Sequence, residues 1–119
     1  RQKRTNSAKA NIDSGREFIA QNYANPENSV VTLCDHLHLS PAYFSTLFKR
    51  ETGRSFVAYL TQVRLEEAVK LLDTAPDKTY EVSLKVGYSE PSYFSYVFKK
   101  QFGVSPSKYR ASKGDANAE

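Results

Sequence analysis

One stretch of this chain occurs twice. The segment "PAYFSTLFKRETG" at residues 41–53 returns as "PSYFSYVFKKQFG" at residues 91–103, and nine of the nineteen positions in 41–59 are identical to those fifty residues later. In each copy a Pro opens a helical pattern, and Gly53 or Gly103 closes it. A short helical segment precedes each copy, so the repeated unit is a short helix, a tight turn and a longer helix. The sequence therefore predicts two helix-turn-helix units.

The longer helix of each copy is expected to have one apolar and one polar face. The apolar residues, expected to be buried, are Phe44, Leu47, Phe48, Phe94, Val97 and Phe98. The outward face mixes small or hydroxyl-bearing residues with a basic pair: Ala42, Ser45, Thr46, Lys49 and Arg50 in the first copy, and Ser92, Ser95, Tyr96, Lys99 and Lys100 in the second. Small and hydroxyl side chains let a helix approach base edges, and Lys and Arg contact phosphates. One such face is most often only solvated, but two matching faces favour a DNA interface.

Between the two copies the sequence predicts a long helix over residues 55–73 with two apolar stripes. Leu65, Ala68 and Leu72 fall about 120° from the other stripe, which contains Phe56, Tyr59, Leu60, Val63 and Leu71. A helix with two apolar stripes is expected to pack between two partners. A helix of this size is about 28 Å long, close to the roughly 34 Å of one turn of B-DNA. We therefore expect two recognition helices one DNA turn apart.

The rest of the chain also favours helix, and no segment alternates in the manner of a strand. A helical face begins at Ile12, although Gly15 costs about 1 kcal/mol relative to Ala and makes this helix dependent on tertiary packing. Thr32 and Asp35 resemble a capping box at the start of a short second helix. Serines are expected to cap the later helices: Ser40, Ser55, Ser89 and Ser105.

These patterns predict an all-α fold in which two helix-turn-helix subdomains are joined by a long central linker helix. The predicted domain occupies about residues 12–110, with a first unit at about 12–54, the linker helix at about 55–73 and a second unit at about 79–110. Residues 1–11 are polar and basic and are expected to form a linker or disordered arm. Residues 111–119 are expected to form a disordered tail.

The charge balance favours an anionic partner. The 119 residues include 17 Lys and Arg against 13 Asp and Glu, with an isoelectric point of about 9.2, which suits nucleic acid or a membrane face. The longest apolar runs are far shorter than the roughly 20 residues of a membrane span, and no secretory signal is recognisable. The single Cys34 excludes an internal disulfide. A cytoplasmic protein with no membrane partner is the simplest interpretation.

Patterns for catalysis or metal binding are weak. His36 and His38 are two residues apart and do not share a helical face, so solvated or turn histidines are favoured over metal ligands. Cys34 has no catalytic base at a convincing spacing and is expected to be a small core residue. The sequence also lacks phosphate-cradling glycine loops and paired carboxylates in apolar surroundings. We therefore expect neither an enzyme nor a cofactor.

Over about residues 12–110 the chain resembles the C-terminal DNA-binding domain of the AraC/XylS family of bacterial transcription regulators. The resemblance rests on "HLSPAYFSTLFKRETGRSF", "QVRLEEAVKLL", "VGYSEPSYFSYVFKKQFGVSP" and the closing "KYR". It implies seven helices, with the third and sixth as recognition helices in adjacent major grooves of duplex DNA. The first copy is similar to response regulators in which a receiver domain precedes this module, while other relatives carry effector-binding domains. An upstream domain that provides dimerisation is therefore expected, with RNA polymerase as a further partner.

The resemblance also implies roles for individual residues. The base-facing positions fall on Ala42, Ser45, Thr46, Pro91, Ser92 and Tyr96. The expected phosphate contacts are Lys49, Arg50, Ser95, Lys99 and Lys100. Arg64 is expected to be a structural or interlobe residue. Cys34 and Ser83 stand where the family usually has Ala, and His38 stands where the second copy has Gly87, at a turn expected to need positive φ.

A second hypothesis from a different class stays open on the sequence alone. The repeated faces could belong to an all-helical adaptor that binds an acidic protein partner. Salt dependence would not distinguish the two hypotheses, because both partners are anionic. A sequence preference for duplex DNA would, since an adaptor has no reason to discriminate between base pairs.

Overall fold

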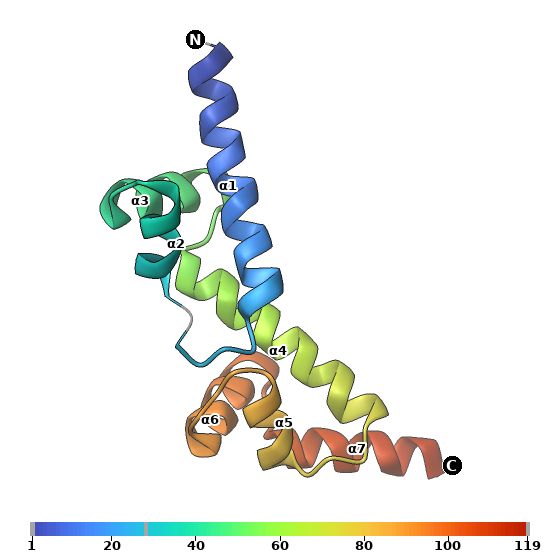
Figure 1. Ribbon diagram of the computed structural model, residues 1–119. Coiled ribbons are helices and arrows are strands. Elements are labelled where there is room, and N and C mark those ends of the chain that lie inside the picture. Colours follow the sequence, from blue (N-terminus) through green and yellow to red (C-terminus); the bar gives the residue numbers. More distant parts are fainter. Residues whose placement is uncertain (1, 28, 119) are drawn as a thin grey trace. The chain divides into compact units, whose positions relative to one another are not determined.

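The computed structural model describes residues 2–27 and 29–118, which form seven helices and contain no strand (Figure 1). The helices are α1 (Gln2–Asn22), α2 (Val30–Leu37), α3 (Pro41–Thr52), α4 (Phe56–Thr74), α5 (Thr79–Lys85), α6 (Pro91–Phe102) and α7 (Pro106–Ala118). The predicted all-α fold with seven helices is confirmed. The chain divides into two compact units whose boundary lies within α4, between Val63 and Arg64.

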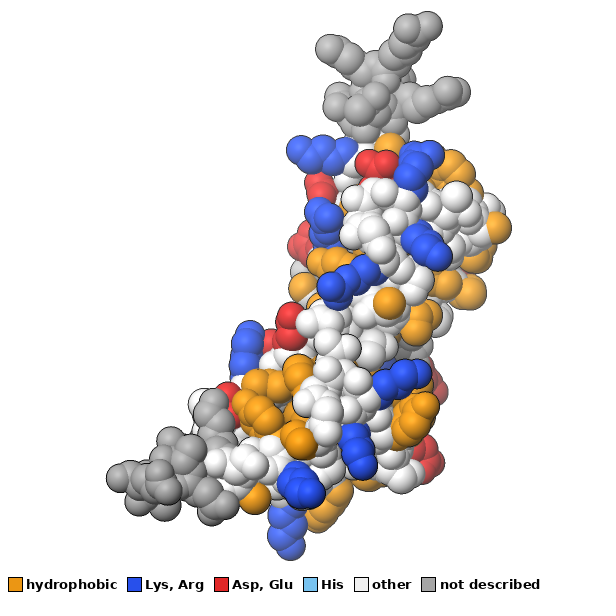
Figure 2. Space-filling model, turned by 180° about the vertical axis from the view of Figure 1, so that it is seen from behind, with side chains coloured by type: hydrophobic (Ala, Val, Ile, Leu, Met, Phe, Trp, Pro, Cys, Tyr) orange, Lys and Arg blue, Asp and Glu red, His pale blue; other side chains and the backbone are white. Residues whose placement is uncertain are grey.

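Charged side chains are mixed with uncharged ones on the surface. Figure 2 shows one face of the molecule, on which Lys and Arg side chains are interspersed with acidic, polar and apolar side chains rather than gathered in a single patch. Because the net charge is only +4, the placement of individual cations matters more than their total. None of the described helices is long and apolar enough to cross a membrane.

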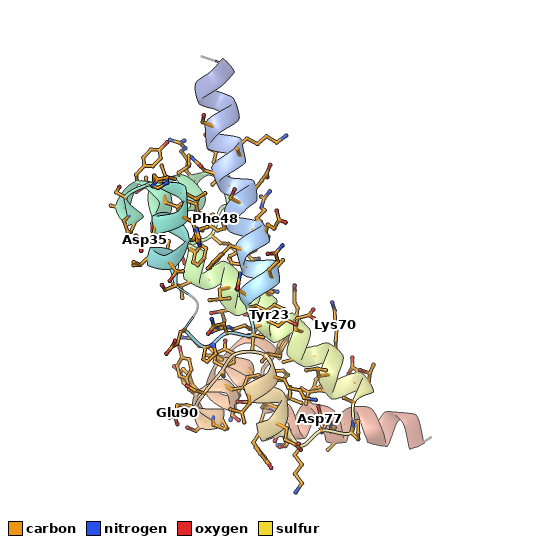
Figure 3. All side chains as sticks on the ribbon, in the orientation of Figure 1. Tyr23, Asp35, Phe48, Lys70, Asp77 and Glu90 are labelled. Atoms are coloured by element: carbon orange, nitrogen blue, oxygen red, sulfur yellow. The ribbon has the colours of Figure 1, made fainter. Side chains whose placement is uncertain are left out.

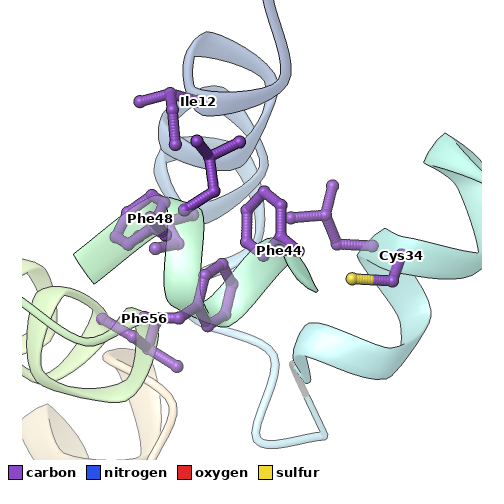
Figure 4. Close-up of a cluster of buried hydrophobic side chains, with 9 residues drawn as sticks. Ile12, Cys34, Phe44, Phe48 and Phe56 are labelled. Atoms are coloured by element: carbon purple, nitrogen blue, oxygen red, sulfur yellow. The ribbon is translucent and has the colours of Figure 1, made fainter. Parts of the chain in front are cut away.

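The core of the first unit is aromatic. Phe44 and Phe48 of α3 are fully buried, with ring centroids 5.6 Å apart, and each packs against Phe56 of α4, at 6.0 and 5.6 Å (Figure 4; Phe48 is also labelled in Figure 3). Aromatic pairs at such distances add about 0.5–1.5 kcal/mol each to the free energy gained by burial. The other buried members of this cluster are Ile12, Ile19, Leu33, Cys34, Leu47 and Leu60. The predicted burial of the apolar face of α3 is thus confirmed.

Gly15 allows α1 to lie directly against these rings. A Cβ atom at this position would lie 2.8 Å from Cζ of Phe44 and 3.2 Å from Cε2 of Phe48. Such distances are shorter than ordinary van der Waals contact, so a larger residue would force the buried rings to move. The expected dependence of α1 on tertiary packing therefore has a definite cause, which is close approach to α3.

The second unit has its own core. Leu65, Ala68 and Leu72 of α4 are buried there, together with Val82, Val86, Phe94 and Phe98. Val97, which the helical projection placed in the buried stripe, is only half-buried. The prediction was therefore too strong for Val97. Leu47, at the matching position of the first copy, is buried, so the difference comes from the packing around each helix and not from the helical period. The first half of α4 contributes Phe56 and Leu60 to the core of the first unit, so the prediction of two apolar stripes on this helix is confirmed.

Two of the predicted N-cap residues are wrong. The N-cap of α2 is Ser29, whose Oγ accepts a hydrogen bond from the backbone N–H of Thr32 at 3.3 Å; Thr32 lies inside the helix. The N-cap of α6 is Glu90 rather than Ser89, and its side chain accepts no capping hydrogen bond. Glu90 is the one-residue insertion relative to the first copy, and it shifts the cap by one position.

The other caps agree with the sequence analysis. The Oγ atoms of Ser40, Ser55 and Ser105 accept backbone hydrogen bonds at 3.1, 3.0 and 3.2 Å, and Gly53 and Gly103 end their helices with φ of 80° and 84°. His38 adopts φ 57° and ψ 42°, the left-handed region, and is the non-glycine residue with positive φ in the described part of the chain. The expected positive φ at this turn is therefore confirmed.

The two ends of the chain are more helical than predicted. α1 begins at Gln2, so residues 2–11, expected to form a linker or disordered arm, are helical. Ala8 explains part of this difference, because it packs against the core one turn before Ile12. α7 continues to Ala118, so most of the expected disordered tail is helical as well. The helix is anchored in its first turn by buried Pro106 and by Tyr109, whose ring centroid lies 5.8 Å from that of Phe98.

Arg110 ties α7 to the end of α4. Its guanidinium donates hydrogen bonds to the carbonyl oxygens of Leu72 at 3.2 Å and Ala75 at 3.1 Å, to that of Leu71 at 3.5 Å, and to that of Asp77. The last carbonyls of a helix have no partner within the helix, and a planar guanidinium with five donors can satisfy several at once. The "KYR" segment therefore stabilises the C-terminus of α4 within the second unit.

We expect Gly15→Ala to destabilise the protein although Ala is the better helix former. The intrinsic gain of about 1 kcal/mol is outweighed by overpacking against Phe44 and Phe48, which costs about 1–3 kcal/mol. Urea unfolding should give a net loss of about 1 kcal/mol. The adjacent Ser14→Ala is the control and should be neutral or slightly stabilising. A gain in stability for Gly15→Ala would contradict the close approach of α1 to α3.

We expect Arg110→Lys to lower the free energy of unfolding by about 2 kcal/mol, because one ammonium cannot replace the divergent donors of the guanidinium and leaves carbonyls unsatisfied. Thermal unfolding of the variant is the measurement. Lys108→Ala, an exposed change on the same helix, should stay within about 0.5 kcal/mol of the wild type. Equal midpoints for the wild type and Arg110→Lys would show that these hydrogen bonds contribute no net stability.

Candidate nucleic-acid interface

The packing of α3 determines which of its residues face outward. Because Phe44, Leu47 and Phe48 point into the core, the opposite side of the helix is left to solvent. All five predicted contact residues on this helix are exposed: Ala42, Ser45, Thr46, Lys49 and Arg50. The side chains therefore run from small and hydroxyl-bearing near the N-terminus of α3 to basic in its last turn.

The outward side of α6 has the same order, with two differences in exposure. Ser92, Tyr96, Lys99 and Lys100 are exposed, whereas Pro91 and Ser95 are half-buried. Pro91 occupies the first turn of the helix, where its missing N–H leaves no hydrogen bond unmade. Less of the surface of Pro91 and Ser95 is therefore open to a partner than the sequence suggested.

The four basic residues of these two helices differ in their surroundings. In residues 2–27 and 29–118, Lys49 and Lys99 take part in no ion pair, so their ammonium groups are available to an anion. Arg50 instead pairs with Glu51, Nε to Oε2, at 3.1 Å, although both side chains remain largely in solvent. Exposed pairs of this kind contribute at most about 1 kcal/mol, so a phosphate could compete with Glu51 for Arg50.

Arg50 also lines a hollow between α1 and α3. The hollow has a volume of about 890 Å³ and is lined by Ala8, Lys9, Ile12, Asp13, Arg16, Tyr43, Arg50 and Glu51. Its charged residues are of both signs, and Arg16 lies 4.0 Å from Asp13. Since its lining contains three cations and two carboxylates, the hollow has no strong preference for either sign of ligand.

Two exposed tyrosines were not among the predicted contact residues. Tyr43 and Tyr93 hold the same position in the two copies, and 52% and 56% of their surfaces are exposed. They lie at the border of the outward face, so the helical projection assigned them neither to the core nor to the interface. The signal was present in the repeat, because both copies keep a Tyr at this position.

Aromatic contacts join the outward side of α6 to the core beneath it. The rings of Tyr93 and Tyr96 are stacked, with centroids 6.4 Å apart and planes inclined by 30°, and Nζ of Lys100 lies 5.9 Å from the Tyr96 centroid. Tyr93 also contacts Tyr88, at 6.0 Å. The outward face of α6 is thus continuous with a buried aromatic ring.

Arg64 lies within the second unit rather than on its surface. Only 9% of the surface of Arg64 is exposed, and its guanidinium carbon lies 5.1 Å from the centroid of the Tyr88 ring. Burial lowers the pKa of Arg64, while the charge and hydrogen bonding of Tyr88 partly offset this shift. An arginine stays protonated at neutral pH all the same. The structure therefore supports the predicted structural role and makes phosphate contact by Arg64 unfavourable.

Cys34 is a core residue, as its sequence context suggested. It is 1% exposed, and burial, assisted by the negative charge of Asp35, raises the pKa of its thiol. A raised pKa reduces the thiolate fraction at neutral pH, and the thiolate is the reactive form. Cys34 is therefore a packing residue. The described residues also contain no group of three or more His, Cys, Asp or Glu that could hold a metal ion.

Two three-helix units with matching outward faces define a double helix-turn-helix domain. A family model described as "Helix-turn-helix domain" matches residues 33–112, which is more than half of the chain. Among curated proteins, the transcriptional regulatory protein YesN of Bacillus subtilis is 41% identical over 104 residues, covering 85% of this chain and 28% of its own length.

Solved structures agree with this relationship. The C-terminal domain of AraT, a response regulator from Geobacillus stearothermophilus, superimposes with a TM-score of 0.83 at 34% identity, covering 86% of this chain and 84% of that one. The DNA-binding domain of the global transcriptional factor AdpA, in complex with a target DNA, gives a TM-score of 0.79 at 26% identity, covering 88% and 96%.

The chain belongs to the AraC family of helix-turn-helix transcription regulators. This confirms the resemblance read from the repeated motifs. The family consists of transcription regulators rather than enzymes, which also confirms the prediction that the chain has no catalytic role. The chain spans 28% of the length of YesN and 37% of the length of the Msm operon regulatory protein of Streptococcus mutans.

Proposed function

We propose that this domain binds specific sequences in double-stranded DNA through α3 and α6, each in a major groove, and thereby regulates bacterial transcription. The observation that carries the proposal is the doubled outward face, small and hydroxyl-bearing at its start and basic at its end, on two helices whose opposite sides are buried. The AdpA domain, a relative of the same fold, was solved on a target DNA, which supports the same partner here.

In this proposal the two ends of each helix have different tasks. The bases are read by Ala42, Ser45, Thr46, Pro91, Ser92 and Tyr96, and phosphates are contacted by Lys49, Arg50, Ser95, Lys99 and Lys100. Phosphate contacts supply affinity that decreases with salt, while base contacts supply discrimination. Ala42 has no hydrogen-bonding group, so its contribution is an apolar contact such as that with a thymine methyl. Engaging two successive grooves from one chain favours bent DNA.

The whole regulator extends beyond this domain in the proposal. Because AraT and YesN-type structures are C-terminal domains of response regulators, a receiver domain or an effector-binding domain upstream is the source of the signal and of dimerisation. RNA polymerase is a further partner of a regulator bound at a promoter. Bacterial chromosomal DNA lies in the cytoplasm, which is therefore the proposed location.

The first test is selection of binding sites from a random duplex library with the purified domain at about 0.15 M salt. We expect two short conserved blocks whose centres lie about 10 base pairs apart, because successive major grooves on one face of B-DNA are one turn apart. If no sequence is enriched, the selection is repeated with an artificially dimerised domain, which excludes a mere lack of avidity. No enrichment in either selection would overturn the proposal and favour an adaptor that binds an acidic protein.

The second test separates affinity from specificity. Lys49→Glu and Lys99→Glu should weaken binding to all sequences at least tenfold and flatten the salt dependence, since each phosphate contact contributes about 0.9 to the slope of log K against log salt. Thr46→Ala and Tyr96→Ala should instead reduce the ratio of specific to non-specific affinity, with little change in that slope. Fluorescence anisotropy over a salt series measures both quantities.

A matched control shows whether the position of the charge matters. Lys108→Glu makes the same change on exposed α7, outside both recognition helices, and should alter affinity much less than Lys49→Glu or Lys99→Glu. Equal losses for all three variants would mean that only net charge is sensed. Unchanged sequence preference in both Thr46→Ala and Tyr96→Ala would show that the base-reading residues are wrongly assigned.

A further inference from the structure

The outward face of α6 carries an ordered aromatic side chain. The Tyr96 ring has Tyr93 three residues before it, stacked at 6.4 Å with planes 30° apart, and Lys100 four residues after it, with Nζ 5.9 Å from the ring centroid. Side chains three and four residues apart are neighbours on a helix, and a cation near an aromatic face is attracted to it. Tyr96 is 60% exposed, and its ring is contacted by one side chain from the preceding turn of the helix and one from the following turn.

Tyr93 is in turn held from below. Its ring centroid lies 6.0 Å from that of Tyr88, which is only 7% exposed and packs against the buried ring of Phe94 at 5.5 Å. The guanidinium of Arg64 lies over the same Tyr88 ring, at 5.1 Å. Tyr88 is therefore held in place by contacts with Arg64, Tyr93 and Phe94. Tyr93 in turn contacts the exposed Tyr96 ring.

The first helix-turn-helix unit lacks this arrangement. Tyr43 corresponds to Tyr93, but the position of Tyr96 is taken by Thr46 and that of Tyr88 by Leu39. Among the ring contacts of the described residues, none involves Tyr43. The two copies thus share their core aromatics and differ in what they present outward.

We propose that Tyr93 is a positioning residue that holds the Tyr96 ring so that its apolar edge meets the methyl group of a thymine in the half-site bound by α6. This inference rests on the proposed function. Tyr93 and Lys100 contact the ring from the preceding and following turns, and the exposed edge of the ring remains for a base. In the major groove the C5-methyl of thymine is the apolar group that such an edge can contact. A fixed ring loses less side-chain entropy on binding than a free one.

The test replaces thymines of the selected site by deoxyuracil, one at a time, which removes only the C5-methyl. The half-site of α6 is the one whose preference Tyr96→Ala relaxes. For the wild type we expect uracil to weaken binding about 2- to 10-fold at one position of this half-site, the range corresponding to a single apolar or aromatic contact. Anisotropy titrations with the intact domain give this thymine-to-uracil affinity ratio for each variant.

Tyr93→Leu should bring the ratio at that position close to one, whereas Tyr93→Phe, which keeps the ring, should retain it. Tyr43→Leu is the matched control, because it changes the equivalent residue where no stacked partner exists, and it should leave the ratio unchanged. In a Tyr96→Ala background, Tyr93→Leu should have no further effect on the ratio, because Tyr93 acts through Tyr96. A merely structural role for Tyr93 would lower affinity without this dependence on the methyl group.

Lys100→Met provides a second route if Tyr93→Leu fails to fold. Lys100 is exposed, and its replacement removes the cation that contacts the Tyr96 ring. The variant should also have a reduced thymine-to-uracil affinity ratio, in addition to weaker binding to all sequences. If the wild-type domain selects a sequence, but Tyr93→Leu (or Lys100→Met, where Tyr93→Leu does not fold) keeps the wild-type thymine-to-uracil affinity ratio, the positioning role is overturned. The proposed function then stays intact. A wild-type domain that selects no sequence would overturn both.

Discussion

The burial of two phenylalanines on each recognition helix is the constraint on which the remaining features of this domain depend. Phe44 and Phe48 in α3, and Phe94 and Phe98 in α6, are essentially inaccessible to solvent. Removing one such side chain from water is worth about 1.5–3 kcal/mol, far more than any contribution of the exposed residues. Rotation of either helix about its axis would expose these rings, so the side that faces outward is determined by the core and not by the outward residues themselves. The outward residues are therefore free to differ between the two copies while the scaffold stays the same.

The second copy uses this freedom more than the first. Both units keep Pro, Tyr, Phe and Ser at the start of the longer helix and Gly at its end. Beyond this shared frame, Tyr88 and Tyr96 stand in the second unit where Leu39 and Thr46 stand in the first. With Tyr93, these two residues form a continuous set of ring contacts from Arg64 to Lys100. The first unit instead presents small side chains, which let the backbone come closer to a partner but constrain the orientation of that partner less.

Most of the fold followed from patterns with short-range causes. The repeat, the apolar stripes, the Gly53 and Gly103 ends and three of the serine caps depend on residues within one or two turns, and the sequence was sufficient to predict them. The Ser89 cap was wrong because a single inserted residue, Glu90, separates Ser89 from Pro91, the first residue of α6. The extent of α1 and α7 was underestimated, since Ala8 and Arg110 act through tertiary contacts that have no helical period. The exposed faces were predicted nearly completely, whereas the contacts of Tyr93 depend on Tyr88, five residues earlier and in a different element, which a projection of one helix cannot include.

Two unlike reading helices on one chain have a consequence that two identical helices would not. A dimer of single helix-turn-helix domains presents the same side chains twice about a two-fold axis, and its site is accordingly palindromic. In this chain Thr46 and Tyr96 stand at matching positions, so the two blocks of a bound site need not resemble each other. Because the order of the two units along the chain is set covalently, the proposed function implies that exchanging the two blocks would produce a different and weaker site. Under the proposed function, an unsymmetrical site gives each bound domain one direction along the DNA, and a regulator with a direction can act on the gene at one side of its site and not on the gene at the other.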